Sequence, residues 1–161
     1  MSVPIIVDEW LFEDLTGNGG REKQIQAILF LNKLYDVCDQ IVILEGSSFE
    51  TKMHTLMKSN NDSPTFISAK RTFIDLIERN SNKKYYITQN ELTDLPEAFI
   101  PLINDPPDHF LFQCHLKLMN KGCFILTTDG RWKEEKLKKK GFRIEKRDSF
   151  IPKYLKHEVS C

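Results

Sequence analysis

Acidic residues follow two apolar runs of this sequence, at points where β-strands are expected to end. Asp8 comes directly after the run VPIIV, and Asp129 follows shortly after the run CFILT. Asp108 begins a segment with helical periodicity, and Glu50 lies three residues after Ser47 at another predicted helix start. Because ligands of open parallel sheets collect beyond the carboxyl ends of the strands, we expect these acids to meet at one edge.

Carboxylates gathered in this way repel one another unless a cation neutralises them. Mg²⁺ and Mn²⁺ prefer hard oxygen ligands of this kind. Either ion can lower the pKa of a bound water and stabilise the attacking and leaving oxygens of a phosphodiester displacement. We therefore predict that Asp8, Asp108 and Asp129 hold Mg²⁺ or Mn²⁺. Glu50 is a further ligand or orients the attacking water, with Glu45 as the alternative fourth acid.

Each of these acids also has an ordinary structural interpretation. An Asp after a strand is often a helix cap or a turn residue. Glu50 can form a capping box with Ser47, and Asp108 follows two prolines at a helix start. Three such coincidences on one edge are rarer than each alone, which favours a shared site. Asp14 and Asp105 are interpreted as loop residues.

A basic segment follows Asp129 and suggests a substrate. Arg131, Trp132 and Lys133 open a stretch that continues as EEKLKKK. The cations could hold a phosphate backbone near the metal site, and Trp132 could stack on an unpaired base. The alternative is a solvated helix face with Trp132 packed inward.

The apolar pattern alternates between strand-like and helix-like segments. Strands are expected at 3–7, 41–44, 85–88, 123–127 and 142–145. Helices are expected at 21–39, 47–58, 69–79, 108–122 and 132–140, with a turn at 16–20 and a loop over 89–107. This alternation predicts one three-layer α/β domain over residues 1–161 with a mainly parallel sheet and a C-terminal tail from about residue 149.

The composition is that of a globular protein. Its 161 residues are 40% hydrophobic, enough for a core without disulfide staples. The four cysteines are far apart with no CxxC pair, which disfavours structural zinc and predicts free thiols. No apolar run is long enough to cross a bilayer, and the start does not resemble a signal peptide. We expect a soluble, cytoplasmic protein with no membrane partner.

The formal net charge of zero hides an asymmetry along the chain. Residues 1–50 hold 3 Lys/Arg and 9 Asp/Glu, whereas residues 111–161 hold 13 Lys/Arg and 6 Asp/Glu. Such a distribution is consistent with a metal cluster beside a polyanion-binding face, or with ordinary solvated surface.

Four segments together resemble the PIN-domain family of metal-dependent nucleases. They are the strand Ile5-Ile-Val-Asp8, the helix start Ser47-Ser-Phe-Glu50, the helix from Asp108 to Gly122, and Phe124-Ile-Leu-Thr-Thr-Asp129. The last is similar to the family's strand–Thr–x–Asp signature, with Thr127 in the Thr place. The resemblance spans roughly residues 3–146. In place of the small hydroxylic residue that the family commonly has after its first Asp, this chain has Glu9.

The resemblance implies an α/β/α sandwich with about five strands and Mg²⁺- or Mn²⁺-dependent endonuclease activity, usually on RNA. Asp8, Glu50, Asp108 and Asp129 would then be the catalytic acids, and Thr127 would position Asp129 or a water through its hydroxyl. Many family members are toxins of toxin–antitoxin pairs, so an antitoxin protein and a second copy of the chain are the protein partners to consider.

Two other functions fit the same residues. A PIN-like fold without catalysis would serve as a nucleic-acid-binding or protein-interaction module. A receiver-like regulatory domain also places acids at strand ends, but it needs a Lys after a late strand, where this chain has Asp129.

Overall fold

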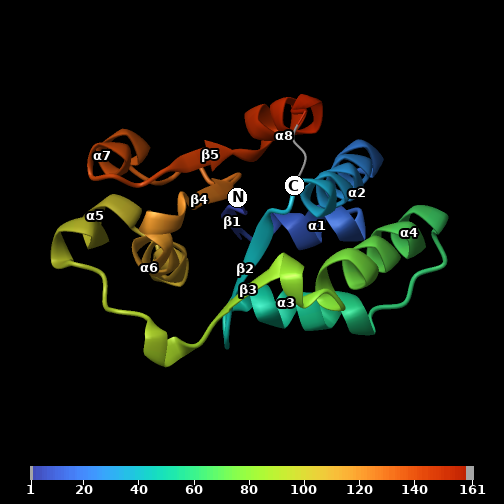
Figure 1. The fold of residues 1–161 in the computed structure, drawn as a ribbon, viewed down its shortest axis with the longest axis horizontal. Helices are drawn as coiled ribbons and strands as arrows, with labels where there is room; N and C mark the ends of the chain where they lie inside the picture. Colours follow the sequence, from blue (N-terminus) through green and yellow to red (C-terminus); the bar gives the residue numbers. More distant parts are fainter. Residues whose placement is uncertain (1, 159–161) are drawn as a thin grey trace.

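The computed structural model describes residues 2–158, which form a central five-stranded parallel sheet (Figure 1). The strands lie in the order β3-β2-β1-β4-β5, and all four neighbouring pairs are parallel. Their bounds are β1 Pro4–Val7, β2 Gln40–Leu44, β3 Lys84–Ile87, β4 Phe124–Thr127 and β5 Ile144–Lys146. The predicted α/β fold with a parallel sheet of about five strands is confirmed.

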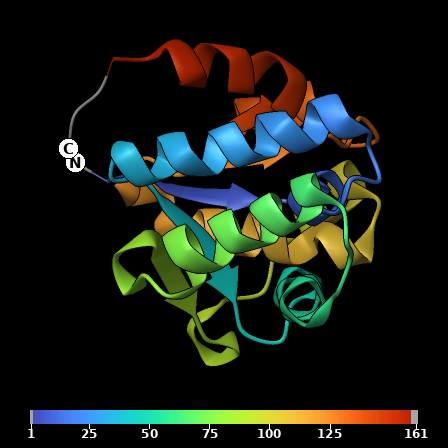
Figure 2. The ribbon, with the colours of Figure 1, turned by 90° about the vertical axis from the view of Figure 1, so that its right-hand side faces the viewer.

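Helices cover both faces of this sheet. The α-helices are α1 Trp10–Thr16, α2 Arg21–Asp36, α3 Ser48–Lys58, α4 Pro64–Phe73, α5 Ile100–Ile103, α6 His109–Leu118, α7 Glu134–Lys139 and α8 Arg147–Lys156. Helices α1 to α4 and α8 pack on one face, and α5 to α7 pack on the other (Figures 1 and 2). Shorter helical segments are η1 Ile74–Glu78, η2 Ser81–Lys83, η3 Gln89–Glu91, η4 Glu97–Phe99, η5 Pro106–Asp108 and η6 Met119–Lys121.

The alternation of side chains along β1 explains the two layers of core. Ile5 and Val7 pack against the α1–α4 side, whereas Ile6 packs against the α5–α7 side. All three are nearly inaccessible to solvent. A strand that is apolar on both faces has to be central in a covered parallel sheet, which is where β1 lies.

Helix α1 is absent from the sequence prediction, which placed only a turn near its end. Its apolar residues Trp10, Leu11, Phe12 and Leu15 are buried. The helix has only seven residues, too few to establish a helical period by pattern alone. It ends at Gly17, whose φ of +88° lies in the left-handed region that glycine adopts without strain.

The stretch expected as a C-terminal tail from about residue 149 falls largely within α8. Pro152 inside this helix argues locally against a helix because proline lacks an N–H donor. Tertiary contacts compensate for it. Arg147 is buried and pairs with Asp14 of α1 at 2.8 Å, and the Tyr154 hydroxyl donates to Asp39 at 2.8 Å. Asp14, interpreted above as a loop residue, is therefore a buried helical residue that anchors α8.

Two helix boundaries also differ from the prediction. The helix expected at 69–79 begins at Pro64, because the Ser63 side chain caps it, and continues as the π-helix η1. The helix expected from Trp132 begins only at Glu134, since Trp132 is buried and the Lys133 N–H donates to the Leu102 carbonyl.

The cysteines and the helices bear on two further expectations from the sequence, free thiols and no membrane-spanning segment. Cys114 and Cys123 are buried free thiols, whereas Cys38 is disulfide-bonded, so the prediction of free thiols is wrong for Cys38. Between residues 2 and 158, none of the helices has the length and apolar character needed to span a bilayer.

Candidate functional site

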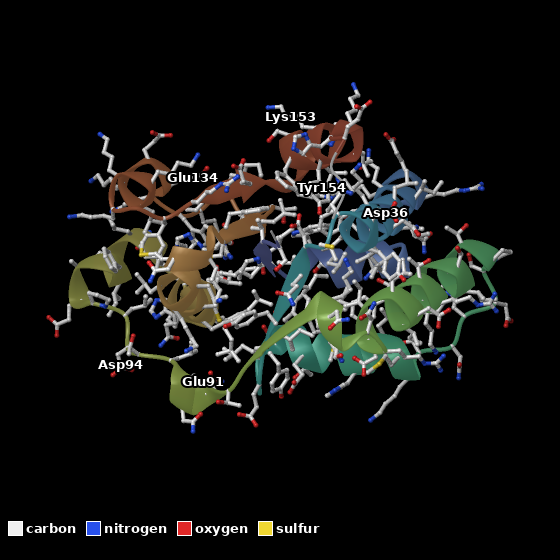
Figure 3. The ribbon with its side chains drawn as sticks, in the orientation of Figure 1. Asp36, Glu91, Asp94, Glu134, Lys153 and Tyr154 are labelled. Atoms are coloured by element: carbon white, nitrogen blue, oxygen red, sulfur yellow. The ribbon has the colours of Figure 1, made fainter. Side chains whose placement is uncertain are left out.

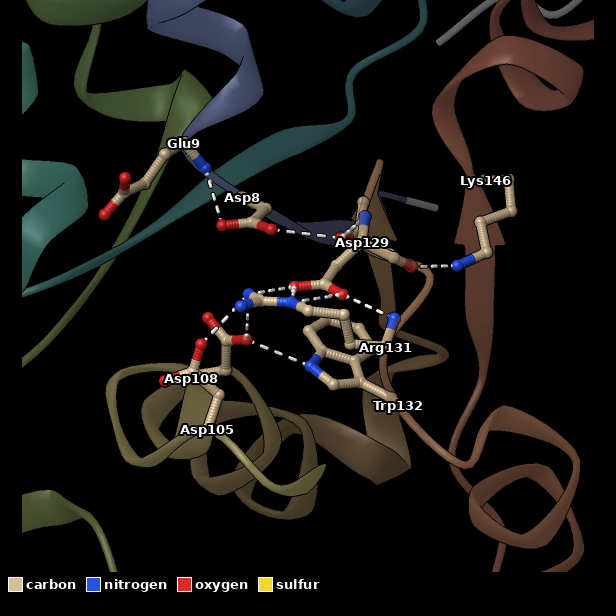
Figure 4. A network of polar contacts seen from close by, with 9 residues as sticks. Asp8, Glu9, Asp105, Asp108, Asp129, Arg131, Trp132 and Lys146 are labelled. Carbon is tan, nitrogen blue, oxygen red and sulfur yellow. Dashed lines mark hydrogen bonds and ion pairs between the residues drawn. The ribbon is translucent and has the colours of Figure 1, made fainter. Parts of the chain in front are cut away.

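Asp8 lies where β1 ends, in the middle of the carboxyl edge of the sheet. Its N–H still pairs with the Leu126 carbonyl of β4, so the strand geometry extends to this residue. Its carboxylate accepts two hydrogen bonds, from the Glu9 N–H at 2.7 Å and from the Thr127 hydroxyl at 3.0 Å (Figure 4). Burial raises the pKa of Asp8, and the charge of Asp129 raises it further.

Thr127, the last residue of β4, connects the ends of two neighbouring strands. Its side chain is fully buried. Its hydroxyl donates to Asp8 and accepts from the Asp129 N–H at 2.9 Å. One hydroxyl therefore fixes the Asp8 carboxylate relative to the backbone that carries Asp129.

Asp129 forms the closest ion pair of the site. Its carboxylate accepts from the Arg131 N–H at 2.7 Å and from the Arg131 guanidinium, with the shortest distance, 2.6 Å, to Nη2. These hydrogen bonds lower the pKa of Asp129. The Lys146 ammonium contacts the Asp129 carbonyl (Figure 4).

Asp108 reaches the same place from the other layer of the protein, at the start of α6. Its carboxylate accepts from the Trp132 indole N–H at 3.0 Å and is largely buried. Burial raises its pKa to about 6, and the neighbouring charges of Asp8, Asp105 and Asp129 act in the same direction. Asp8, Asp108 and Asp129 are therefore close enough to influence one another electrostatically.

Asp105 also belongs to this cluster, although it was interpreted from the sequence as a loop residue. Its carboxylate lies 2.9 Å from Arg131 Nη2. The short helix η5 connects it to Asp108, and the Asp108 N–H donates to the Asp105 carbonyl at 3.0 Å. The two prolines between these acids restrict the backbone to this turn. An acid on each side of a Pro-Pro pair was the signal available in the sequence.

Glu50 does not join the aspartates in this structure. The Ser47 hydroxyl accepts from its N–H at 3.2 Å, as expected for a helix cap. Its carboxylate accepts from the Gly46 N–H at 3.1 Å and from the Tyr86 hydroxyl at 2.9 Å. The alternative acid, Glu45, contacts Gln89 instead. Both glutamates follow β2, and their carboxylates are hydrogen-bonded to residues close to the ends of β2 and β3.

The three residues predicted to contact substrate differ in exposure. Trp132 is only 5% exposed and packs edge-on against Phe112, so the prediction that it stacks on a base is wrong, and the inward-packed alternative holds. Arg131 and Lys133 are exposed. Arg131, however, directs its guanidinium into the cluster of acids (Figure 4).

A cation already lies among these carboxylates, which bears on whether a metal fits. The Arg131 guanidinium contacts Asp129 and Asp105 and lies 3.8 Å from Asp108. Residues 2–158 contain no group of three His, Cys, Asp or Glu side chains placed to hold a metal ion. The donors are all hard carboxylate oxygens of the kind that Mg²⁺ prefers, and the Arg131 side chain that contacts them is 69% exposed. In the described arrangement, the Arg131 guanidinium takes the place among these carboxylates that such a cation would need.

The fold and site define an α/β protein with an aspartate cluster at the carboxyl edge of its parallel sheet. Comparison with protein-family models finds no match to the sequence, and searches of the curated proteins and of the solved structures find no significant match.

Proposed function

We propose that this protein is a PIN-like, metal-dependent nuclease that hydrolyses phosphodiester bonds, with single-stranded RNA as its substrate. One observation carries the proposal. The Arg131 guanidinium contacts Asp105 and Asp129 and lies 3.8 Å from Asp108, and burial together with the charge of nearby Asp8 raises the pKa of Asp108 to about 6. Partly buried acids with raised pKa values cluster at functional sites.

Each residue of the site has a defined part in this proposal. Asp8, Asp108 and Asp129 would hold Mg²⁺ or Mn²⁺, and such an ion supplies an activated water and charge stabilisation at the scissile phosphate. Thr127 keeps the Asp8 carboxylate in a fixed orientation through its hydrogen bond. Arg131 neutralises the acids until a cation displaces it, and its released guanidinium is then available for a substrate phosphate.

Positive residues beside the acids support a polyanionic substrate. Lys146 of β5 contacts the Asp129 carbonyl and lies 2.8 Å from Glu134 at the start of α7. Figure 3 locates Glu134 on α7, next to β5. The lysines of α7 and Lys140, which follow the site along the chain, are exposed. A phosphate backbone passing the acids would therefore meet cations, as the charge asymmetry along the sequence predicts.

The second candidate is a PIN-like module that binds nucleic acid or a protein without catalysis. The specific observation in its favour is that Arg131 already pairs with Asp105 and Asp129, which therefore have a positive partner without a metal. In that case the acids would have a structural role and the protein would not cleave RNA.

Cleavage of a labelled single-stranded RNA in the presence of Mn²⁺ tests the proposal. We expect cleavage that EDTA abolishes and that Asp8→Asn or Asp129→Asn reduces at least about 100-fold, because each change removes an oxygen ligand and its charge. Asp94→Asn is the matched control, since Asp94 is an exposed residue of the loop after η3 (Figure 3). RNA binding by the wild type without any cleavage would support the non-catalytic module instead.

A further inference from the structure

A cavity of about 510 Å³ lies beside α8, at the amino edge of the sheet. Phe124 begins β4 and Arg143 comes directly before β5, and both residues line the cavity. Lys153 and Tyr154 add to the lining from α8 (Figure 3). Asp129 lies beyond the opposite end of β4, so the cavity is separate from the aspartate cluster. Its volume is that of a typical small-molecule site.

Aromatic rings in mutual contact form the apolar part of the lining. The ring centroid of Phe150 lies 5.0 Å from that of Phe124 and 5.1 Å from that of Tyr154. The rings of Phe150 and Tyr154 are stacked, with their planes 25° apart. Phe124 and Tyr154 are buried, whereas Phe150 is only partly buried. The cavity therefore offers flat ring surfaces, against which a planar aromatic ligand packs well.

Two cationic side chains lie beside these rings and are available to an anion. Lys153 is exposed, and none of the ion pairs described within residues 2–158 involves it. The Arg143 guanidinium lies over the Phe124 ring, 4.8 Å from its centroid. Arg143 also lies 3.6 Å from Glu145, but their side chains are 55% and 37% exposed, and such a pair contributes little. An anionic ligand can therefore contact both cations.

We propose that this cavity binds a mononucleotide, with its base against Phe150 and Tyr154 and its phosphate at Arg143 and Lys153. A nucleobase has the flat faces that stack on aromatic rings, and a phosphate accepts the paired N–H groups of a guanidinium. A second acid of the lining, Asp39, already accepts hydrogen bonds through both carboxylate oxygens. Binding at this edge does not involve the aspartates, so it is independent of the proposed nuclease activity.

Titration of the full chain with adenosine monophosphate, followed by proton–nitrogen NMR in the presence of EDTA, tests the inference. We expect the backbone signals of Arg143, Lys153 and Tyr154 to shift. Adenosine, which has the base without the phosphate, should bind at least about fivefold more weakly, since it lacks the charged contacts. An unmoved spectrum at millimolar nucleotide, or equal affinities for the two probes, would overturn the inference. So would shifts confined to residues 127–131, which would locate the nucleotide at the aspartates instead.

Two substitutions separate the phosphate contact from the base contact. Lys153→Gln should weaken the binding of adenosine monophosphate about fivefold and leave adenosine binding unchanged. Lys156→Gln is the matched control, because Lys156 is an exposed lysine of the same helix outside the lining. Phe150→Leu keeps an apolar side chain but removes the ring, so it should weaken both probes about 10-fold. Equal effects of the two lysine variants on the nucleotide, or unchanged binding in Phe150→Leu, would contradict the proposed contacts.

Discussion

At the scale of single residues, the site is a set of carboxylates that compete for one positive group. Asp129 makes the closest contacts with this group, the Arg131 guanidinium, and its hydrogen bonds with Arg131 lower its pKa. Asp108 is partly buried and lies farther from Arg131, at 3.8 Å, and burial raises its pKa to about 6. A charged Asp108 therefore destabilises the fold at neutral pH, and this cost is consistent with selection for function rather than for stability.

Arg131 should compete with a divalent cation for these carboxylates. In Arg131→Gln the positive charge is removed, and we expect Mn²⁺ to bind about fivefold more tightly, since an exposed ion pair of this kind contributes modestly. Arg79→Gln is the control, because Arg79 is an exposed arginine paired with Asp75 far from the site and the net charge changes equally. Calorimetric titration measures both affinities. Weaker binding in Arg131→Gln than in Arg79→Gln would contradict competition.

The residues of the site could be predicted from the sequence only in part. Asp8 and Asp129 are recognisable because each follows an apolar strand, and parallel strands place their carboxyl ends together. Asp105 is not recognisable in this way, since its position depends on the turn that the two prolines impose. The orientation of Trp132 depends on Phe112, twenty residues away in the sequence, and no local pattern reports such a contact.

At the scale of elements, α6 places a buried histidine in the core, beside the segment that leads into β5. His115 is nearly inaccessible, and its Nε2 accepts from the Arg143 N–H at 3.1 Å. Within residues 2–158 its Nδ1 has no hydrogen-bond partner. Burial lowers the pKa of His115 to about 4, with the positive charge of Arg143 acting in the same direction. The folded protein thus requires the neutral imidazole.

Acid should therefore loosen the packing of α6. The pKa of His115 is lowered in the folded state, so its stabilising contribution is complete above about 6.5, the unfolded value, and is lost as pH falls toward 4. Between pH 7 and pH 5 we expect this group to reduce the free energy of unfolding by about 2 kcal/mol. His115→Gln should reduce that pH dependence, whereas the exposed His54→Gln should not. Urea unfolding at both pH values is the measurement, and identical pH slopes in wild type and His115→Gln would contradict it.

The central strands could be predicted from their apolar runs, whereas helix α8, which depends on tertiary contacts, could not. The three central strands β2, β1 and β4 are largely apolar runs, which is why the parallel sheet follows from the sequence. Helix α8 contains Pro152 and is held by Arg147 and Tyr154, whose partners Asp14 and Asp39 are more than a hundred residues distant. Local propensity gives no information about such partners.

At the scale of the whole molecule, folding brings residues of the acidic first part and the basic last part of the chain together at one edge of the sheet. The acidic first part contributes Asp8 through β1, and the basic last part contributes Arg131 and Lys146 around β4 and β5. Because β1 and β4 are neighbours in the sheet, the two regions meet at its carboxyl edge. Opposite charges placed side by side can attract a cation and a polyanion to the same place.

A cation that binds the folded protein alone should raise its melting temperature. At free Mn²⁺ a hundredfold above its dissociation constant, the expected stabilisation is about 2.7 kcal/mol. For a chain of this size that corresponds to roughly 5–10 °C. Sodium chloride at matched ionic strength controls for screening of the acids, since screening alone also weakens their repulsion. Asp8→Asn and Asp129→Asn should lose most of the Mn²⁺-dependent shift, whereas Asp94→Asn should keep it. If millimolar Mn²⁺ leaves the wild-type melting curve unchanged, or shifts the Asp8→Asn curve equally, the aspartates do not form a cation site and their clustering is explained by Arg131 alone.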